Sequence, residues 1–538
     1  MRYNIKIQVF FVFFFASACA IFAQQTSFEK VDFSIPKTIY FTGERVWIAS
    51  SASKEELPAS SQIIYAELVN RFNESVAISK MPLVEGSSFN FLQIPTNIPS
   101  DHYLLRVFTR VSPHQNLEQG LVQRFITVFN SNVPPAVVAQ RKNLAQTQNS
   151  SEITLSQEDG KAGSTLTIQL PKGTEINEVS IAAVNPFLSD AGKISSRTAY
   201  SSIQEHSLIP ELFGHVIEAK IDEVEVDTTQ LYYVSVHGEK SALFTDRPNA
   251  AGSLYFDAGG MKHWNYLVAQ ADGNKSLLDF GIVSPAPVTQ FQENFTFPEL
   301  EISPADQAYL EELLKGGQVE GYFVNEYDES SFPVVTGFVE DRTYLLDDYT
   351  RFETVETVVK EYIQEISVKN IKKKKEFRSI DEALDGNFDS NPLMLIDALP
   401  VFDSDKLAAF DPKEFKSLDV LSRSFYLNEE KFPGVMSFSS YKNDFGGFPI
   451  PSNGIYLDYA GIQPRVVSFQ SLFDAPSQDE NIMDWRTVLF WSATSGTDEL
   501  SDTIQITVPQ LKGTFLISVK ASSEQGMAKE YLRTFEVK

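Results

Sequence analysis

The stretch TIYFTGERVWIAS, residues 38–50, decides the fold class of this chain. Apolar and polar residues alternate on both sides of Thr42-Gly43, and a period of two is typical of β-strands with one buried face. On this pattern Gly43 turns a hairpin, and Val46 and Ile48 point inward. Further runs of this kind before residue 130 are QIIYAELVN, SFNFLQIP, HYLLRVFTRV and LVQRFITVF. Several short strands within about 100 residues predict an antiparallel β-sandwich.

The same pattern recurs along the rest of the chain. Residues 131–150 contain Pro134-Pro135 and a Gln/Asn/Ser tract, so we expect a linker there. Residues 206–300 are rich in strand runs such as LYYVSVHG and predict a second β-sandwich. The C-terminal strands in residues 446–538 are too few to close a sandwich alone. We therefore expect them to pair with the strand runs in residues 151–205.

Helical signals are confined to two places. In SPADQAYLEELLKGG, Ser303 is expected to cap a helix and Gly316-Gly317 to end it, which makes residues 301–345 a helical connector. Thr354 precedes VETVVKEYIQEI, where apolar residues recur at helical spacing. This second helix opens residues 346–445, in which strand runs such as NPLMLID alternate with short helical signals. The segment predicts a small α+β domain.

The first residues, MRYNIKIQVFFVFFFASACAIFAQQ, have the form of a secretory signal peptide. Two basic residues precede an apolar run, and small residues precede Gln24. We expect residues 1–23 to be removed by cleavage between Ala23 and Gln24. The alternative is lipidation of Cys19, and a single acyl chain would anchor the protein only weakly.

Charge and cysteine content exclude several classes of function. Cys19 is the single cysteine, so a mature chain would lack disulfides, thiolate zinc sites and a cysteine nucleophile. The whole chain has a net charge of −26; without residues 1–23 its 45 basic residues become 43 against 71 acidic, or −28. Such a surface repels nucleic acid. No later apolar run approaches the ~20 residues of a membrane helix, so no transmembrane span is expected.

Catalytic and cofactor motifs are not found. The histidines do not form an HExxH pattern, although His237 and His263 could meet in the middle sandwich, and neither a GxSxG nor a Walker-type pattern occurs. Asp403–Asp405 and Asp347-Asp348 offer oxygens to calcium but lack the other spaced ligands, so turn-forming aspartates are the better account. We expect no enzyme activity, no cofactor and no metal site.

A run of four lysines is the main candidate for a binding site. Its residues are Lys372, Lys373, Lys374 and Lys375. In so acidic a chain they could contact an anionic face of a partner or a lipid phosphate. The alternative is a solvated loop or a charged edge strand that discourages sheet pairing.

Two sets of motifs resemble known families. TIYFTGERVWIAS, with Tyr40, Gly43, Glu44 and Trp47, together with IPSDHYLLRVFTR, resembles the opening domain of alpha-2-macroglobulin-type proteins. The resemblance implies a macroglobulin-like β-sandwich for residues 24–130. The Cys-Gly-Glu-Gln thioester of macroglobulin-type protease traps does not occur in this sequence, so covalent trapping is not implied.

The second resemblance extends over most of the chain. A Bacteroidetes-type family of exported proteins joins macroglobulin-like β-domains to a segment similar to the plug of TonB-dependent receptors. The resemblance implies a plug-like domain at residues 346–445. Two departures are Ala398, which stands where a plug usually carries glycine, and the lack of a TonB-contact segment near Gln24. The motifs, in family order, are LDDYTRFETVETVVKEYI, NPLMLIDALPVFD, FDPKEFKSLDVL, FYLNEEKFPGVMSFSSYK and WRTVLFWSA.

These observations predict a mainly β protein with several macroglobulin-like or immunoglobulin-like β-sandwiches plus a small α+β plug-like domain. The expected function is non-enzymatic binding or assembly in the cell envelope, in association with an outer-membrane transport or secretion protein through the plug-like module. The expected partner is an outer-membrane barrel or another envelope protein. The expected location is the periplasm, the outer membrane or the cell surface. The alternative is a macroglobulin-like binder of peptides or proteases without thioester chemistry. The oligomeric state is not indicated by the sequence.

Overall fold

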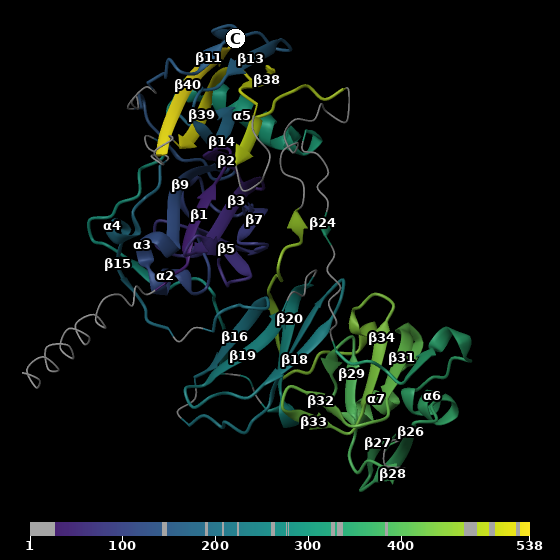
Figure 1. The fold of residues 1–538 in the computed structure, drawn as a ribbon. Helices are drawn as coiled ribbons and strands as arrows, with labels where there is room; N and C mark the ends of the chain where they lie inside the picture. The colour runs from purple at the N-terminus through teal and green to yellow at the C-terminus, as the bar shows by residue number, and fades with distance from the viewer. Residues whose placement is uncertain are drawn as a thin grey trace, which may run out of the picture. The chain divides into compact units, whose positions relative to one another are not determined.

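The computed structural model consists mostly of β-strands with a few short helices (Figure 1), which confirms the predicted fold class. The chain divides into two compact units. The first unit falls within residues 1–210, 287–328 and 465–538, and the second within 211–286 and 329–464. Each unit therefore combines segments that are far apart in the sequence. The structure describes residues 27–141, 148–188, 192–206, 209–222, 225–259, 264–275, 277, 279–323, 329–330, 337–381, 386–466, 481–493, 501–522 and 528–538.

The first β-sandwich, in the first unit, packs two sheets face to face. Val46, Ile48, Leu105 and Ile126 are fully buried in its core. One sheet contains β1 (Lys30–Ser34), β3 (Arg45–Lys54), β4 (Leu57–Pro58) and β7 (Ser87–Gln93). The other has the order β2 (Ile39–Phe41), β9 (Leu121–Phe129), β8 (Asp101–Phe108), β5 (Ile63–Val69) and β6 (Ser75–Pro82).

Gly43 connects strands that lie in different sheets. Its φ is 89°, a conformation that favours glycine. The predicted hairpin is wrong, because β2 bonds in parallel to β9 whereas β3 bonds to β1 and β7. Val46 and Ile48 are buried as predicted. Trp47 between them is also buried, because a second hydrophobic cluster containing Trp491 covers the other face of β3.

A two-stranded ribbon covers the outer face of the second sheet. It consists of β15 (Tyr200–Ile203) and β22 (Thr289–Phe291), paired antiparallel. Arg106 of β8 joins Glu67 through Nε and Oε2 at 2.5 Å and donates from Nη1 to Thr289 Oγ1 at 3.0 Å. Tyr200 Oη donates to Gln123 Oε1 at 2.7 Å. The central strands of this sheet are therefore buried on both faces.

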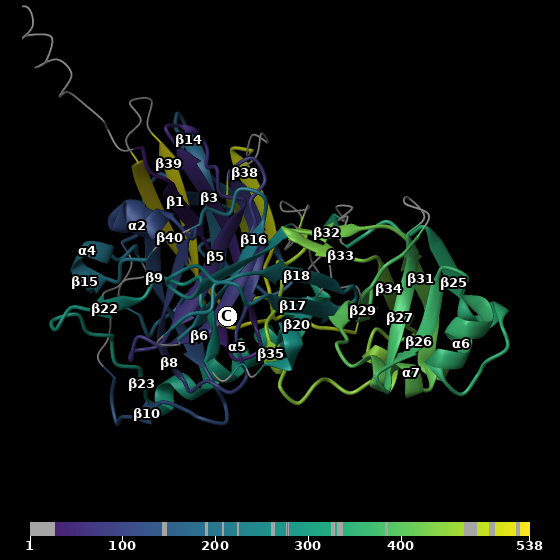
Figure 2. The same ribbon diagram turned by 90° about the horizontal axis from the view of Figure 1, so that it is seen from below.

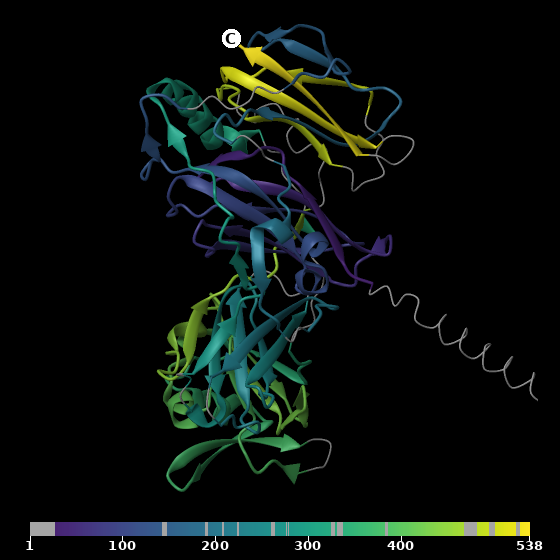
Figure 3. The same ribbon diagram turned by 90° about the vertical axis from the view of Figure 1, so that its left-hand side faces the viewer.

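Another sandwich of the first unit joins residues from opposite ends of the chain. β13 (Thr165–Gln169) pairs with β38 (Thr503–Thr507), and β14 (Glu175–Ala183) lies between β37 (Val488–Ala493) and β39 (Gly513–Ser522). β40 (Ala528–Val537) lies beside β39 in the same sheet. The long-range pairing expected from the sequence is thus present: Figure 3 shows the yellow C-terminal strands beside blue strands from the first part of the chain.

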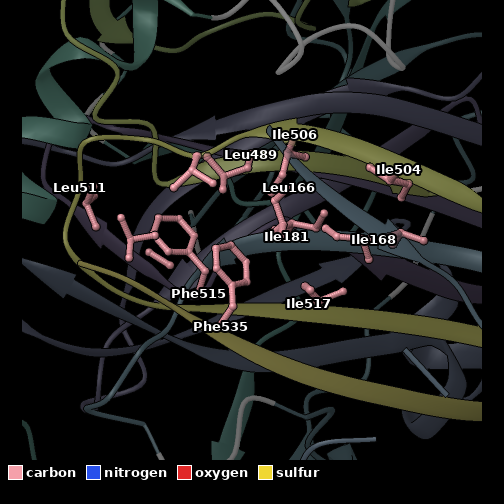
Figure 4. Close-up of a cluster of buried hydrophobic side chains, with 14 of the residues drawn as sticks. Leu166, Ile168, Ile181, Leu489, Ile504, Ile506, Leu511, Phe515, Ile517 and Phe535 are labelled. Carbon is pink, nitrogen blue, oxygen red and sulfur yellow. The ribbon is translucent and has the colours of Figure 1, made fainter. Parts of the chain in front are cut away.

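The core of this sandwich is aliphatic and aromatic. Leu166, Ile181, Ile504 and Phe515 gather in one buried cluster (Figure 4). The short strands β11 (Thr154–Leu155) and β12 (Asp159–Gly160) also belong to this sandwich, beside β13 and β40. Other short elements of the first unit are α2 (Ser112–Gln115), α3 (Leu117–Gly120), α4 (Ser196–Ala199), β10 (Ala136–Val137), β23 (Glu301–Ile302) and β36 (Arg465–Val466).

A helix of the first unit continues through two glycines. α5 spans Gln307–Val319 and is followed by the 3₁₀ turn η3 (Glu320–Tyr322). The prediction that Gly316-Gly317 ends the helix is wrong. A Cβ at Gly316 would lie 2.6 Å from the Trp485 carbonyl oxygen, and one at Gly317 would lie 2.3 Å from Glu44 Oε1. These glycines therefore allow close packing of the helix. The expected cap at Ser303 is part of a capping box with Asp306.

The second unit contains another β-sandwich. Its core includes Ile217, Val234, Phe256 and Leu267. One of its strands, β35 (Ile455–Asp458), follows the α+β domain in sequence, so that domain is an insertion into this sandwich. One sheet has the order β19 (Ser253–Gly259), β16 (His215–Ile221) and β21 (Phe280–Val283). The other has the order β18 (Ala242–Asp246), β17 (Tyr232–Gly238), β20 (Trp264–Ala271) and β35 (Ile455–Asp458).

The α+β domain is built on a mixed sheet that is covered on both faces. α6 (Val355–Tyr362) and α7 (Ser404–Ala409) lie on one face (Figure 2). Thr354 caps α6 as predicted, accepting a hydrogen bond from Thr357 N at 3.2 Å. On the other face, Leu395 and Val435 pack in one cluster with Tyr233 of β17. The strand order is β25 (Arg342–Leu345), β31 (Phe415–Leu421), β34 (Val435–Ser440), β29 (Leu393–Ile396) and β30 (Leu399–Pro400).

Candidate partner-binding surface

The four lysines lie at the turn of a β-hairpin in the α+β domain. β26 (Ile366–Ile371) pairs antiparallel with β27 (Lys374–Asp381), and Ile371 stands opposite Lys374. Lys372 and Lys373 form the two-residue turn, with φ of 50° and 67°. Positive φ at both central residues is the mark of a type I′ turn, where Asn-Gly is usual. This hairpin thus has lysines at two positions whose left-handed backbone conformation is unfavourable for lysine.

The four lysines fall into two groups. Lys372, Lys373 and Lys374 are exposed, and in the part of the chain that the structure describes none of their side chains forms an ion pair. Lys375 is engaged: its Nζ lies 2.7 Å from Glu356 Oε1, and its backbone N–H donates to Asp405 Oδ1 at 2.7 Å. Three positive charges are therefore available at the end of the hairpin, which we call the basic tip (Lys372, Lys373 and Lys374).

Contacts with both helices fix the base of the hairpin. Ser404 Oγ of α7 donates to the Lys375 carbonyl oxygen at 2.5 Å, and Phe377 of β27 is fully buried in the core beneath the helices. Glu356 of α6 also accepts from Lys360 Nζ at 2.6 Å. Hydrogen bonds from Lys360 and Lys375 hold the pKa of Glu356 below its usual value. The basic tip is consequently presented from a well-packed support.

The aspartates considered for calcium have structural partners. Asp403 caps α7 by accepting from Lys406 N at 3.0 Å, which agrees with a turn-forming role. Asp347 Oδ1 lies 2.5 Å from Arg351 Nη2 and accepts from Tyr441 Oη at 2.6 Å. Among the described residues, no group of three or more His, Cys, Asp or Glu is placed to hold a metal ion.

Of the predicted histidine pair and cleavage site, only His237 lies among the residues that the structure describes. His237 is buried, with Ser235 Oγ 2.8 Å from Nε2 and Ser241 Oγ 3.1 Å from Nδ1. Burial lowers the pKa of His237 to about 3, so the ring is neutral. His263, Ala23 and Gln24 lie outside the described residues. No helix in the described part of the chain is long and apolar enough to cross a bilayer.

One polar cluster that the sequence analysis missed surrounds a buried lysine of the first unit. Lys37 Nζ lies 2.5 Å from Glu44 Oε2 and 3.7 Å from Glu320 Oε2, and donates to Thr487 Oγ1 at 2.9 Å. Burial lowers the pKa of Lys37, but the two carboxylates outweigh burial and raise it overall. No local sequence signal connects these residues, because they come from three distant parts of the chain.

A second missed cluster, in the second unit, is a carboxylate, an imidazole and a phenol in a row. His215 Nδ1 lies 2.8 Å from Glu211 Oε1, and His215 Nε2 lies 2.8 Å from Tyr459 Oη. The spacing Glu-x-x-x-His was its only sequence signal. Glu211 Oε1 also accepts from Val216 N at 3.0 Å. The cluster thus connects the start of β16 with the chain that follows β35.

Comparisons with known proteins find likeness only among solved structures. No family model matches the chain, and no curated protein matches it. It is similar to Salmonella alpha-2-macroglobulin reacted with methylamine (9% identity, 95% of this chain and 23% of that one, TM-score 0.16). It is also similar to Escherichia coli alpha-2-macroglobulin in its native conformation (8% identity, 96% of this chain and 22% of that one, TM-score 0.16). A third similar structure is a DUF4785 family protein from Legionella pneumophila (10% identity, 50% of this chain and 58% of that one, TM-score 0.14).

The chain covers less than a quarter of the length of these two macroglobulins. The structural neighbours of this chain include bacterial alpha-2-macroglobulin β-domains at very low sequence identity.

Proposed function

We propose that the protein is a non-enzymatic binding and assembly protein of the cell envelope. It is exported, acts in the periplasm or at the outer membrane or cell surface, and associates with an outer-membrane transport or secretion protein. The observation that carries this proposal is the basic tip, which presents three exposed ammonium groups, without an ion pair among the described residues, on a chain of net charge −26.

The geometry favours the basic tip over the sheet as the contact. Both faces of the mixed sheet of the α+β domain are covered inside the second unit, by α6 and α7 on one side and by the β-sandwich of that unit on the other. The hairpin turn is exposed, and lysine ammonium groups suit an anionic surface. The expected partner is a protein with an acidic patch, and the association should weaken as salt is added.

Co-purification tests the proposal. The tagged full chain is recovered from detergent-solubilised envelopes of the producing bacterium, beside a K372Q/K373Q/K374Q variant. We expect an outer-membrane protein to accompany the unaltered chain and to be lost from the variant. The matched control K161Q/K172Q/K512Q changes three exposed lysines of the first unit and should retain the partner. Failure of the unaltered chain to bring down any outer-membrane protein would reject the proposal.

A second candidate is a macroglobulin-like binder of peptides or proteases that lacks thioester chemistry. The tandem β-sandwiches of the first unit support it, because such domains also build macroglobulin-type frames. The test mixes the full chain with active or inhibitor-blocked trypsin before size-exclusion chromatography. Active trypsin should co-elute with the chain and dissociate in denaturant. If active trypsin and inhibitor-blocked trypsin both elute alone, the result would count against this candidate.

A further inference from the structure

The cluster around Lys37 connects three parts of the first unit. Lys37 precedes β2, Glu44 follows the turn at Gly43, and Glu320 begins η3 directly after α5. Thr487, directly before β37, supplies a fourth polar group through its hydroxyl. The cluster is therefore where the C-terminal end of α5 is attached to the first β-sandwich.

The charges of this cluster are unequal. One ammonium faces two carboxylates, and the nearer, Glu44, also accepts from Phe41 N at 3.0 Å. Glu320 lies farther from Lys37 and keeps 18% of its side chain exposed, which leaves it a route to exchange protons with water. With Glu320 ionised, the cluster has a surplus negative charge in a mostly buried place, which is costly.

The other charged and titratable groups near Glu320 have known positions. Arg45, beside Glu44, favours the ionised form of Glu320, although less than Lys37 does. Tyr40 lies under Lys37, with Nζ 4.8 Å from its ring centroid, and burial raises its pKa well above the usual value. Arg486 lies over the ring of Phe323 and pairs with Asp484 at 2.8 Å. Lys37 and Arg45 therefore favour an ionised Glu320, whereas burial and Glu44 oppose it.

We propose that Glu320 makes the attachment of α5 and η3 to the first β-sandwich dependent on pH. The segment is held when Glu320 is protonated and is loosened when Glu320 is ionised. Gly316 and Gly317 make the attachment sensitive, because the helix backbone approaches Trp485 and Glu44 with no room for a side chain between them. The proposal concerns the first unit alone and does not depend on the basic tip.

The direction of the effect follows from the proton affinity of each state. Burial raises the pKa of Glu320 from its usual 4.5 to about 7; Lys37 opposes this rise and Glu44 adds to it. Between pH 4.5 and 7, Glu320 therefore binds a proton in the attached state and releases it in the open state. Opening becomes easier as the pH rises from 4.5 to 7, and then becomes nearly independent of pH.

Hydrogen exchange of the full chain tests the proposal. After correction for intrinsic exchange rates, the opening constant of amides in α5 and η3 should rise roughly 40-fold from pH 5 to 7, and only about twofold more from pH 7 to 8. In E320Q the same amides should show no such rise. The control E311Q removes an exposed carboxylate of the same helix and should behave as the unaltered chain does.

Either of two results would overturn the proposal. One is a pH-dependent rise in E320Q equal to that of the unaltered chain. The other needs no variant: an opening constant in the unaltered chain that stays flat from pH 5 to 7, or that keeps rising tenfold per unit above pH 8. This second measurement remains decisive if E320Q does not fold.

Discussion

Lysines have opposite roles in the two units. Lys37 is buried and faces two carboxylates, so its charge is used entirely inside the first unit. The basic tip of the second unit has three lysines with no ion-pair partner among the described residues, so its charge is available to another molecule. The difference shows that burial and partners, more than residue type, decide whether a charge stabilises the fold or serves recognition.

Removing the buried charge should have the largest effect. K37M leaves Glu44 and Glu320 without their ammonium and should cost about 3–5 kcal/mol of unfolding free energy, as expected for one broken side of a buried pair. Calorimetry of the full chain would show an earlier transition for the first unit. The same substitution in the basic tip, K374M, should change stability by less than about 0.5 kcal/mol. Equal losses in the two variants would contradict the comparison.

The loss in K37M should itself depend on pH. Burial raises the pKa of Glu320 to about 7 while Lys37 opposes it, so removing Lys37 should raise that pKa further. The folded state then binds a proton over a wider pH range, and acid stabilises it relative to the unfolded chain. Between pH 8 and 5, K37M should recover on the order of 1 kcal/mol relative to the unaltered chain. Parallel stability curves for the two proteins would argue against this assignment.

Replacing the turn lysines should separate charge from fold. The variant K372N/K373G places the residues that a type I′ turn prefers at the two positions of positive φ. We expect a gain of about 0.5–1 kcal/mol in the second unit, because strain at two left-handed residues is relieved. Partner binding should nevertheless fall, since two of the three charges are lost. A stabilised variant that still binds fully would show that the tip is not the contact.

The smallest effect is expected at the boundary of the basic tip. K375A removes a half-buried ion pair with Glu356 and should cost about 0.2–1 kcal/mol. K374A, one residue away, removes no ion pair and should be neutral. Thermal unfolding of both variants measures the difference, and a larger loss for K374A would reverse the division of the four lysines proposed above.

Local signals in the sequence predicted local structure well. The capping residues Ser303 and Thr354 depend on neighbours within a few residues, and the structure contains both caps. Val46 and Ile48 are buried as their alternation predicts, although Trp47 is buried too. Gly43 and Gly316-Gly317 were assigned incorrectly, because their surroundings come from distant strands. A glycine required for a close approach looks the same in sequence as one that ends a helix.

The polar clusters depend on distant segments in the same way. Glu320 meets Lys37 only after α5 has packed against the first sandwich, and Tyr459 meets His215 only after the inserted α+β domain has been passed. Hydrophobic periodicity contains no information about such pairs. The run of four lysines is visible in the sequence. Its division into the basic tip, which forms no ion pair among the described residues, and the paired Lys375 required the positions of α6 and α7.

The position of β14 between β37 and β39 has a consequence for synthesis. Glu178 and Lys520, which form an ion pair across this sheet, are 342 positions apart. During synthesis from the N-terminus the first sandwich can fold early, whereas β14 must wait for nearly the whole chain before its partners exist. A nascent chain therefore has an open strand edge for most of its production, and a polypeptide ending before Gly513 never closes that edge. We expect such fragments to be aggregation-prone and rapidly degraded.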